Sequence, residues 1–527
     1  MKTRVFILYT GGTIGMAPKD PRDPFSPLTP RPLAELLTYV PGFDADAVVD
    51  DTRFLSDEAK NLARKNKHRD KDKRTAFMEM ENGNVIEFGY DSFAKPVDSS
   101  DLTPGDWKRM ATMIEAVYDQ YDAFILLHGT DTMAFTSSAL SFMFENLGKP
   151  VVITGSQRPI AAERTDAVTN LVNAIHVAGY KAANLPLIPE VVIVFADRIL
   201  RGCRASKTRS KHPAGFDSPN YPWLGRIGEQ IVIDAKHVLP PPAPDKPFFV
   251  TTDLDERVFN LSIFPGFSGS QAAKILLDEE IRGIVIRSYG TGNAPNNPDF
   301  LNGIQRAVDA GRLIVNVSQC TQGTVEMGLY EAGLGLLERG VLSGFDMTTE
   351  AALTKLMWIL GTQSGQDRGT QMQIAQRGEQ TENLFDLRFG SLDKEEAKGI
   401  YVHSVSPDGR LDRDWISRVV LRIFGLGCPQ AKTGDHIRVK VFMNMSDADH
   451  ETLLTEECEI VSMEFTYDAE EPIKTYMNNA TYKTRSVIGN RDIILTLVSE
   501  HKRKGNNDYE STLIFFRGLF LAIYAKA

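Results

Sequence analysis

Short apolar runs that end in loops rich in glycine and hydroxyl side chains constrain the fold of this chain more than any other feature. In the N-terminal part, these β-like runs cover residues 5–9, 124–127, 151–154 and 191–196. They are apolar on both faces and alternate with helical patterns, so they predict a parallel sheet covered by helices. Because ligands bind at the carboxyl ends of such strands, we expect the loops at 10–15, 128–132 and 155–158 to gather at one edge.

Helical patterns and a proline-rich spacer organise the α/β part of the chain. Three segments with apolar residues at helical spacing are 107–121, 134–147 and 171–178, and Gly148 is expected to end the second. Residues 240–246 (PPPAPDK) form a semi-rigid linker, which predicts a larger parallel-sheet domain at 1–240. After it, strand and helix patterns resume at 284–287, 313–317 and 351–360. They predict a smaller α/β domain at 247–368.

The pattern changes after about residue 370. Residues 436–441 alternate apolar and polar side chains with a period of two, which is typical of a half-buried strand. Other β candidates, spaced by Gly, Asn and Asp turns, are 419–424, 459–465, 493–498 and 513–516. We therefore expect residues 370–527 to form a mainly antiparallel β module, such as a sandwich, to which the sequence assigns no role.

Composition and charge exclude several classes of protein. Hydrophobic residues are 42% and charged residues 24% of the chain, which excludes a disordered, collagen-like or coiled-coil protein. A formal net charge of −10 argues against a nucleic-acid-binding protein as a whole. Residues 60–74 are dense in Lys and Arg, but Asp70 and Asp72 dilute the charge and few aromatics are interleaved. We interpret this run as a solvated loop or helix face.

Cysteine usage and targeting signals point to a soluble cytoplasmic protein. The four cysteines are far apart, so neither a zinc ribbon nor a disulfide scaffold is expected. The run at 5–9 is shorter than a signal-peptide core. The segment 513–525 is interrupted by Arg517 and Gly518 and is well short of the ~20 residues of a membrane helix. We expect no membrane partner, and nothing requires a metal or an organic cofactor.

The first candidate motif is TGGTIG at 10–15, directly after a predicted strand. Such a turn can hold an anion with its backbone N–H groups, although the glycines alone indicate only a tight turn. It is neither a dinucleotide fingerprint nor a phosphate loop. The motif contains two threonines, Thr10 and Thr13, and a hydroxyl presented at a strand end can act as a nucleophile if a base activates it.

The second motif, HGTDTM at 128–133, places Thr130 beside Asp131. Asp131 can orient a threonine or bind an ammonium group, although a Thr-Asp pair is more often a helix N-cap. His128 is expected to be a structural hydrogen-bonding residue, because it has no Cys or His partners that would suggest a metal site.

Two further motifs have strong structural explanations. Residues 98–101 (DSSD) precede a helix, where capping is ordinary. Residues 197–208 follow the fourth strand and contain Lys207. A lysine near other cations can become a general base, although most such lysines are solvated.

Taken together, TGGTIG at 10–15 and HGTDTM at 128–133 resemble the L-asparaginase family. The cytoplasmic type I branch is similar at 127–159, 98–101 (DSSD), 287–295 (RSYGTGNAP) and 318–320 (SQC). The resemblance covers about residues 1–365 and not 370–527, and 44–90 looks expanded.

The resemblance implies a two-step hydrolysis of the side-chain amide of L-asparagine without a cofactor. Thr13 matches the family nucleophile, which forms an acyl ester and releases ammonia before water frees aspartate. Thr130, Asp131 and Lys207 match a second set of catalytic residues, in which Lys207 is oriented by Asp131, tunes the Thr130 hydroxyl and positions water. Which threonine attacks first stays open at this point.

The resemblance also implies how the substrate is held. Asp98, Ser99 and Ser100 match the loop that holds the α-carboxylate and amine, and Asp131 would pair with the α-ammonium beside Thr130. Amide hydrolysis also needs donors for the oxyanion, and backbone N–H groups near Gly12 or Gly129 can supply them.

The resemblance implies three further features, and at one of them this sequence departs from the family. The family usually has a tyrosine on the mobile loop after TGGTIG, where Phe25 stands here, in a loop at 16–32 that we expect to be a lid. In some relatives the smaller domain carries an allosteric asparagine site, whose location Arg287, Ser318 and Cys320 match. The family builds sites at subunit contacts, so a homodimer or homotetramer is expected.

L-asparaginase is the leading hypothesis, and three alternatives stay open. One is a glutaminase-asparaginase, and another is an amidase in transamidation of charged tRNA, for which residues 60–74 are the only hint. The third is a non-catalytic amino-acid-binding protein with the β module as an interaction arm. The complete set of Thr13, Thr130, Asp131 and Lys207 argues against the third.

Overall fold

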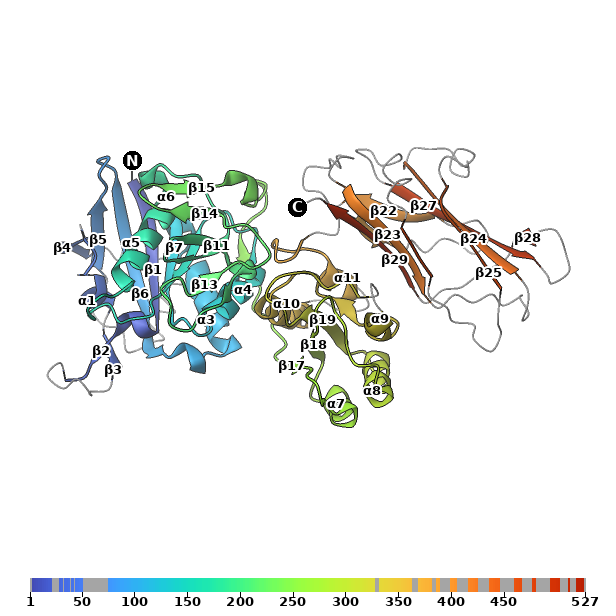
Figure 1. Ribbon diagram of the computed structural model, residues 1–527. Helices are drawn as coiled ribbons and strands as arrows, with labels where there is room; N and C mark the ends of the chain where they lie inside the picture. Colours follow the sequence, from blue (N-terminus) through green and yellow to red (C-terminus); the bar gives the residue numbers. More distant parts are fainter. Residues whose placement is uncertain are drawn as a thin grey trace. The chain divides into compact units, whose positions relative to one another are not determined.

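The computed structural model divides the chain into two compact units, Met1–Gln380 and Thr381–Ala527 (Figure 1). It describes residues 2–20, 28–31, 33–37, 39–41, 43–50, 74–327, 331–362 and 368–381, and nine strands between residues 385 and 525. Phe25, the β candidate at 513–516 and the basic run up to residue 73 lie outside the described residues. No helix in the described part has both the length and the apolar character to cross a membrane.

A ten-stranded sheet forms the centre of the first unit, in the order β15-β14-β11-β10-β9-β7-β1-β6-β5-β4. Its five middle strands are parallel: β10 (Val191–Phe195), β9 (Val151–Thr154), β7 (Ala123–Leu127), β1 (Lys2–Gly11) and β6 (Val85–Val97). The predicted parallel sheet is therefore confirmed. The strands on either side of these five pair in antiparallel fashion and were not predicted: β11 (Arg198–Arg201), β14 (Gly225–Ile227), β15 (Ile231–Ile233), β5 (Arg74–Glu79) and β4 (Phe43–Asp50).

Successive side chains of β1 point to opposite faces of this sheet, and each face carries its own core. Val5 and Ile7 pack with the helices on one face, which are α1 (Leu33–Leu37), α5 (Ala167–Ala178) and α6 (Tyr180–Ala183). Phe6 and Leu8 pack on the other face with α3 (Pro104–Glu115) and α4 (Met133–Met143). The sheet is thus covered on both faces, as a parallel sheet requires.

The three predicted helices of this part differ in their bounds, and the third, α5, begins at Ala167 instead of residue 171. The helix expected at 107–121 begins earlier, because Thr103 and Asp106 form a capping box around Pro104, and it ends at Glu115. The helix expected at 134–147 ends at Met143, so Gly148 does not end it. The chain there becomes β8 (Phe144–Glu145), which pairs with β16 (Phe249–Val250) beyond the spacer.

A second parallel sheet follows the spacer, in the order β17-β18-β19-β20. Its strands are β17 (Val258–Ser262), β18 (Gly283–Ser288), β19 (Leu313–Ser318) and β20 (Leu342–Ser343). Helices α7 (Gly269–Leu276), α8 (Pro298–Asp309) and α9 (Glu331–Leu337) pack in one core, and α10 (Thr349–Thr362) in another, followed by α11 (Arg368–Gln373). The second core includes Phe142 of α4, so α10 packs against a helix that covers the large sheet.

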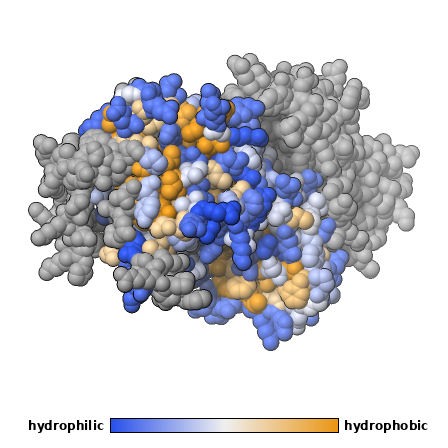
Figure 2. Space-filling model, turned by 60° about the vertical axis from the view of Figure 1, so that its left-hand side comes forward, coloured by the Kyte–Doolittle hydropathy of each residue, from blue (hydrophilic) through white to orange (hydrophobic). Residues whose placement is uncertain are grey.

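Short elements complete the first unit. They are β2 (Met16–Pro18), β3 (Leu28–Pro30), β12 (Ser206–Lys207), β13 (Phe216–Asp217) and the 3-10 helices η1 (Thr13–Gly15), η3 (Ser99–Asp101), η4 (Tyr118–Gln120), η5 (Gly202–Arg204) and η6 (Ala235–His237). The face in Figure 2 is mainly hydrophilic, with smaller groups of hydrophobic residues.

The division of this unit at residues 240–246, into 1–240 and 247–368, remains our proposal.

All described strand pairs of the second unit are antiparallel, which confirms the predicted β module. One sheet contains β21 (Phe385–Arg388), β22 (Gly399–Ser404), β27 (Ile493–Lys502), β24 (His436–Met445) and β25 (Glu459–Thr466), with β28 (Glu510–Ser511) beside β27. The other contains β26 (Tyr476–Asn479), β23 (Ile416–Phe424) and β29 (Gly518–Ala525).

Candidate active site

Glycines allow three loops to meet at the carboxyl edge of the large sheet. A Cβ atom on Gly12, whose φ is 89°, would lie 2.3 Å from the backbone nitrogen of Gly129. A Cβ on Gly129 would lie 2.5 Å from the hydroxyl oxygen of Ser99. Only residues without a side chain permit this approach. The loops that carry Thr13, Thr130 and Ser99 are therefore in contact.

The loop after β9 joins this group. A Cβ on Gly155 would lie 2.3 Å from the carbonyl oxygen of His128, and His128 donates its backbone N–H to the carbonyl of Thr154 at 2.9 Å. The predicted gathering of the loops at 10–15, 128–132 and 155–158 is thus confirmed.

Lys207 reaches the loop after β7 from β12, which follows β11 in the sequence. Its Nζ donates to Oγ1 of Thr130 at 2.8 Å and to Oδ1 of Asp131 at 2.7 Å. The side chain of Lys207 is 18% exposed, whereas that of Asp131 is 64% exposed. The ammonium group is therefore held against a buried hydroxyl, and the carboxylate keeps an oxygen open to a cationic ligand.

The loop at 98–101 has two separate supports. Asp98 accepts hydrogen bonds from the backbone N–H and the hydroxyl of Ser100 at 2.9 and 2.8 Å, and these bonds lower the pKa of the Asp98 carboxyl. Ser99 is buried, accepts from the backbone N–H of Asp131 at 3.2 Å, and offers its carbonyl to the hydroxyl of Thr132 at 2.7 Å. Asp98 and Ser100 are exposed, so they remain accessible beside Asp131.

His128 lies behind the loop and is fully buried. Its Nδ1 lies 2.6 Å from the carbonyl of Gly129, which only accepts, so Nδ1 carries the proton. Its Nε2 then accepts from the hydroxyl of Thr136 at 2.9 Å, and that oxygen accepts from the indole of Trp107 at 3.0 Å. Burial lowers the pKa of His128 to about 4, so the ring is neutral at pH 7 and supports the loop through hydrogen bonds.

This depressed pKa predicts an acid-labile contribution to stability. The unfolded chain binds a proton at His128 near pH 6.5, whereas the folded protein does so only near pH 4, so stability is lost as the pH falls through this window. This difference between the unfolded and folded pKa of His128 corresponds to about 3 kcal/mol. Urea unfolding of the wild type and of His128→Gln at pH 7 and pH 4 measures it: the wild type should lose about 3 kcal/mol more than the variant. Equal losses would contradict this assignment.

The residues matched to an effector site lie together at the carboxyl edge of the second sheet. Arg287 lies on β18, and Ser318 ends the neighbouring strand β19. The hydroxyl of Ser318 donates to the carbonyl of Gly290 at 2.6 Å and accepts from the N–H of the exposed Cys320 at 3.0 Å. Sequence reasoning missed Gln319, whose amide donates to the carbonyl of Arg287 at 2.7 Å. The effector role of this edge remains a prediction.

Sequence reasoning also missed the contacts around the segment that carries Lys207. Ser206 donates its hydroxyl to Oε1 of Glu350 on α10 at 2.7 Å. Arg201 pairs with Glu190 at 2.6 Å, and both side chains are buried. The only sequence signal was the density of cations in 197–208, which does not identify partners that are distant in sequence.

Comparison with known proteins agrees with this geometry. Residues 4–239 match the asparaginase N-terminal family model, and residues 257–372 match the glutaminase/asparaginase C-terminal domain. The chain therefore belongs to the asparaginase family, as the motifs indicated.

Individual relatives carry different names. L-asparaginase 1 of Escherichia coli (strain K12) is 44% identical over 276 residues, which are 52% of this chain and 79% of that protein. The 60 kDa lysophospholipase of Mus musculus is 34% identical over 454 residues, which are 84% of this chain and 73% of that protein. The crystal structure of L-asparaginase I from Vibrio cholerae O1 biovar eltor has 36% identity and a TM-score of 0.57, and the match covers 72% of this chain and 100% of that one.

Proposed function

We propose that the protein hydrolyses the side-chain amide of L-asparagine to L-aspartate and ammonia through an acyl ester on Thr13. The observation that carries this proposal is the position of Lys207 Nζ, 2.8 Å from Thr130 and 2.7 Å from Asp131. This set lies where Gly129 meets Gly12, the residue directly before Thr13. A nucleophile, a proton-transfer group and a carboxylate for the substrate ammonium are thereby supplied from three segments.

In the first step, the hydroxyl oxygen of Thr13 attacks the amide carbon and the C–N bond breaks. The hydroxyl proton passes to the departing nitrogen, which leaves as ammonia, and an ester with Thr13 remains. Backbone N–H groups of the glycine loops at 11–12 and 129 are the candidate donors for the negatively charged oxygen of the intermediate. An oxyanion donor of this kind typically contributes about 3–4 kcal/mol to lowering the barrier.

In the second step, water attacks the ester, and Thr13 regains its proton. Thr130 and Lys207 position this water and transfer its proton, while Asp131 orients Lys207 and pairs with the substrate ammonium. Asp98, Ser99 and Ser100 form the loop that holds the α-carboxylate and amine of the substrate. The free amino acid carries both charges, and this arrangement of an exposed carboxylate beside hydroxyl groups suits such a zwitterion.

Replacing Lys207 by methionine tests the proposal directly. We expect kcat/KM for asparagine to fall about 10²–10⁴-fold, because the proton-transfer group is lost. Lys211→Met is the matched control, since Lys211 is an exposed lysine in the loop that follows Lys207, and it should keep wild-type activity. Activity is measured as ammonia released from asparagine. A Lys207→Met variant as active as the control would remove Lys207 from the mechanism.

Ester hydrolysis is a second candidate function, because the similarity to a lysophospholipase extends over 84% of this chain. A threonine acyl intermediate can form from an ester as well as from an amide. Parallel assays with asparagine, glutamine and lysophosphatidylcholine separate the candidates. Ammonia from asparagine alone supports the first proposal, ammonia from both amino acids indicates a glutaminase-asparaginase, and fatty-acid release supports the esterase.

Assembly and location belong to the same proposal. We infer a homodimer or homotetramer in the cytoplasm, on the basis of the family to which the chain belongs. Analytical ultracentrifugation of the full chain tests the assembly, and a monomer that is fully active would contradict it.

A further inference from the structure

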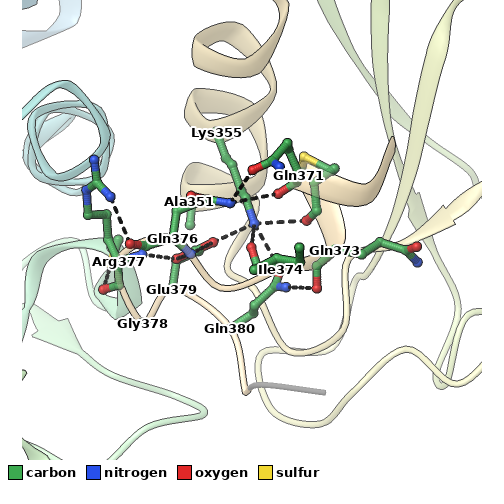
Figure 3. A network of polar contacts seen from close by, with 12 residues as sticks. Ala351, Lys355, Gln371, Gln373, Ile374, Gln376, Arg377, Gly378, Glu379 and Gln380 are labelled. Atoms are coloured by element: carbon green, nitrogen blue, oxygen red, sulfur yellow. Dashed lines mark hydrogen bonds and ion pairs between the residues drawn. The ribbon is translucent and has the colours of Figure 1, made fainter. Parts of the chain in front are cut away.

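A segment at 371–380, which we call the strap, lies between the two sheet domains of the first unit. It starts within α11 and runs to the last residue of that unit. The matched C-terminal family model ends at residue 372, so most of the strap lies beyond it. Figure 3 shows Lys355 directed at the strap from its helix, with Arg377 pointing to the other side.

One side of the strap is held by Lys355 of α10, whose side chain is fully buried. Its Nζ donates to the carbonyls of Met372 and Ile374 at 2.9 and 2.6 Å and pairs with the carboxylate of Glu379 at 2.5 Å. Glu379 is also fully buried and accepts from the backbone N–H of Arg377 at 2.8 Å. These contacts fold the strap into a turn around one ammonium group.

The other side is held by the larger domain through Arg377. Its Nε donates to the carbonyl of Ser141 on α4 at 3.0 Å, and its Nη2 pairs with Glu145 at 2.6 Å. The strap is thus attached to α10 and α4 at the same time.

The backbone carbonyls of the strap reach a third element, the segment that leads to Lys207. Gly378 accepts from Nε of Arg204 at 2.8 Å and from Nη1 of Arg201 at 3.2 Å. The carbonyl of Arg377 accepts from the thiol of Cys203 at 3.4 Å. Gly378 has a φ of +71°, and a Cβ there would lie 2.4 Å from Nη1 of Arg201. The positive φ, together with this close approach, favours glycine at 378.

Lys207 follows Arg204 by three residues, and the intervening Ser206 is bonded to Glu350 of α10 at 2.7 Å. We propose that Arg377 and Gly378 are positioning residues for Lys207, because their carbonyls hold η5 and so set where Nζ meets Thr130 and Asp131. This inference rests on the proposed function. A displacement of a catalytic group by about 1 Å can lower a rate about 10²-fold. The loop at 98–101 is held by the bond of Asp98 to Ser100 and by the bond of Ser99 to the backbone N–H of Asp131, neither of which involves the Lys207 side chain, so substrate binding by this loop should be spared.

The test is Gly378→Ala in the full chain. We expect kcat for asparagine to fall about tenfold or more, while KM stays within about twofold, because Lys207 moves and the binding loop does not. Backbone amides of residues 202–207 should exchange with deuterium faster than in the wild type, since their support is weakened. Gln376→Ala is the matched control, because the Gln376 side chain contacts only Gln371 among the contacts described for it, and it should change neither quantity.

A second variant covers the case in which Gly378→Ala does not fold. Arg377→Ala removes the attachment to Ser141 and Glu145 and should give the same decrease in kcat at constant KM, and Arg377→Lys should recover part of it. Folded variants with wild-type kcat, or with a raised KM alone, would overturn the inference. A wild type inactive on asparagine would instead refute the proposed function, and the exchange of residues 202–207 would still decide whether the strap supports η5.

Discussion

Replacing Thr13 by alanine is expected to lower ammonia release from asparagine by about 10⁴-fold or more, because the ester that divides the reaction into two steps cannot form. Thr13 is half-buried at the start of η1, so the loss of its hydroxyl leaves the packing of the loop intact. Thermal unfolding should therefore be close to that of the wild type. Thr13→Ser keeps a hydroxyl and should retain part of the activity.

Thr10 provides the matched control within the same motif. Its hydroxyl donates to the carbonyl of Leu127 at 3.0 Å, which joins β1 to the end of β7. Thr10→Ala should cost about 1 kcal/mol of stability, the usual value of such a hydrogen bond, and keep turnover near the wild-type rate. If Thr13→Ala were as active as Thr10→Ala, the nucleophile would have to be sought elsewhere, first at Thr130.

Replacing Glu379 by alanine is expected to lower the free energy of unfolding of the first unit by about 3–5 kcal/mol. The substitution leaves the ammonium of Lys355 buried without a counter-charge, and both side chains are fully buried. Burial works against the charge of Glu379, but the Lys355 ammonium holds the pKa of that carboxyl below its ordinary value. The Glu379 carboxyl therefore contributes stability above the unfolded pKa of a glutamate, and this contribution is lost as the pH falls, whereas burial lowers the pKa of Lys355 and works against its charge.

Urea unfolding of the full chain followed by tryptophan fluorescence measures this effect. Trp358 lies on α10 and stacks on Phe142 of α4 at 6.1 Å, so its signal reports the contact between the two sheet domains. Lys236→Ala breaks an exposed pair with Asp234 and should change stability by at most about 1 kcal/mol. An equally small effect of Glu379→Ala would show that the pair does not hold the strap.

The parallel part of the fold could be predicted because its strands are almost wholly apolar. β7, β9 and β10 are buried at every position, and their runs in the sequence have nearly the observed bounds. β6 was missed, although it pairs with β1 in the middle of the sheet. It contains the charged Glu87, which is buried against Lys2 at 2.6 Å and Arg4 at 3.3 Å on β1. A hydrophobic pattern cannot identify a strand whose charge is compensated by its neighbour.

The candidate site was predictable for a related reason. The carboxyl ends of neighbouring parallel strands meet at one edge of a sheet. Because the loops of Thr13 and Thr130 each follow a predicted parallel strand, they could be placed together from the sequence. The strap could not be predicted, because its contacts join Arg377 to Ser141 and Gly378 to Arg204, which are far apart in the sequence. No local sequence pattern indicates that Gly378 and the buried Lys355 belong to one network of hydrogen bonds.

The central position of β1 has a consequence for biosynthesis. Lys2 pairs with Val85 of β6, and Tyr9 pairs with Leu127 of β7, so β1 leaves the ribosome well before either of its neighbours in the sheet. During this interval its apolar segment at 5–9 presents two open hydrogen-bonding edges, which is the arrangement most prone to pair with other chains. We therefore expect nascent chains to expose β1 until residue 127 has been translated, and slower translation before residue 127 to prolong this exposure.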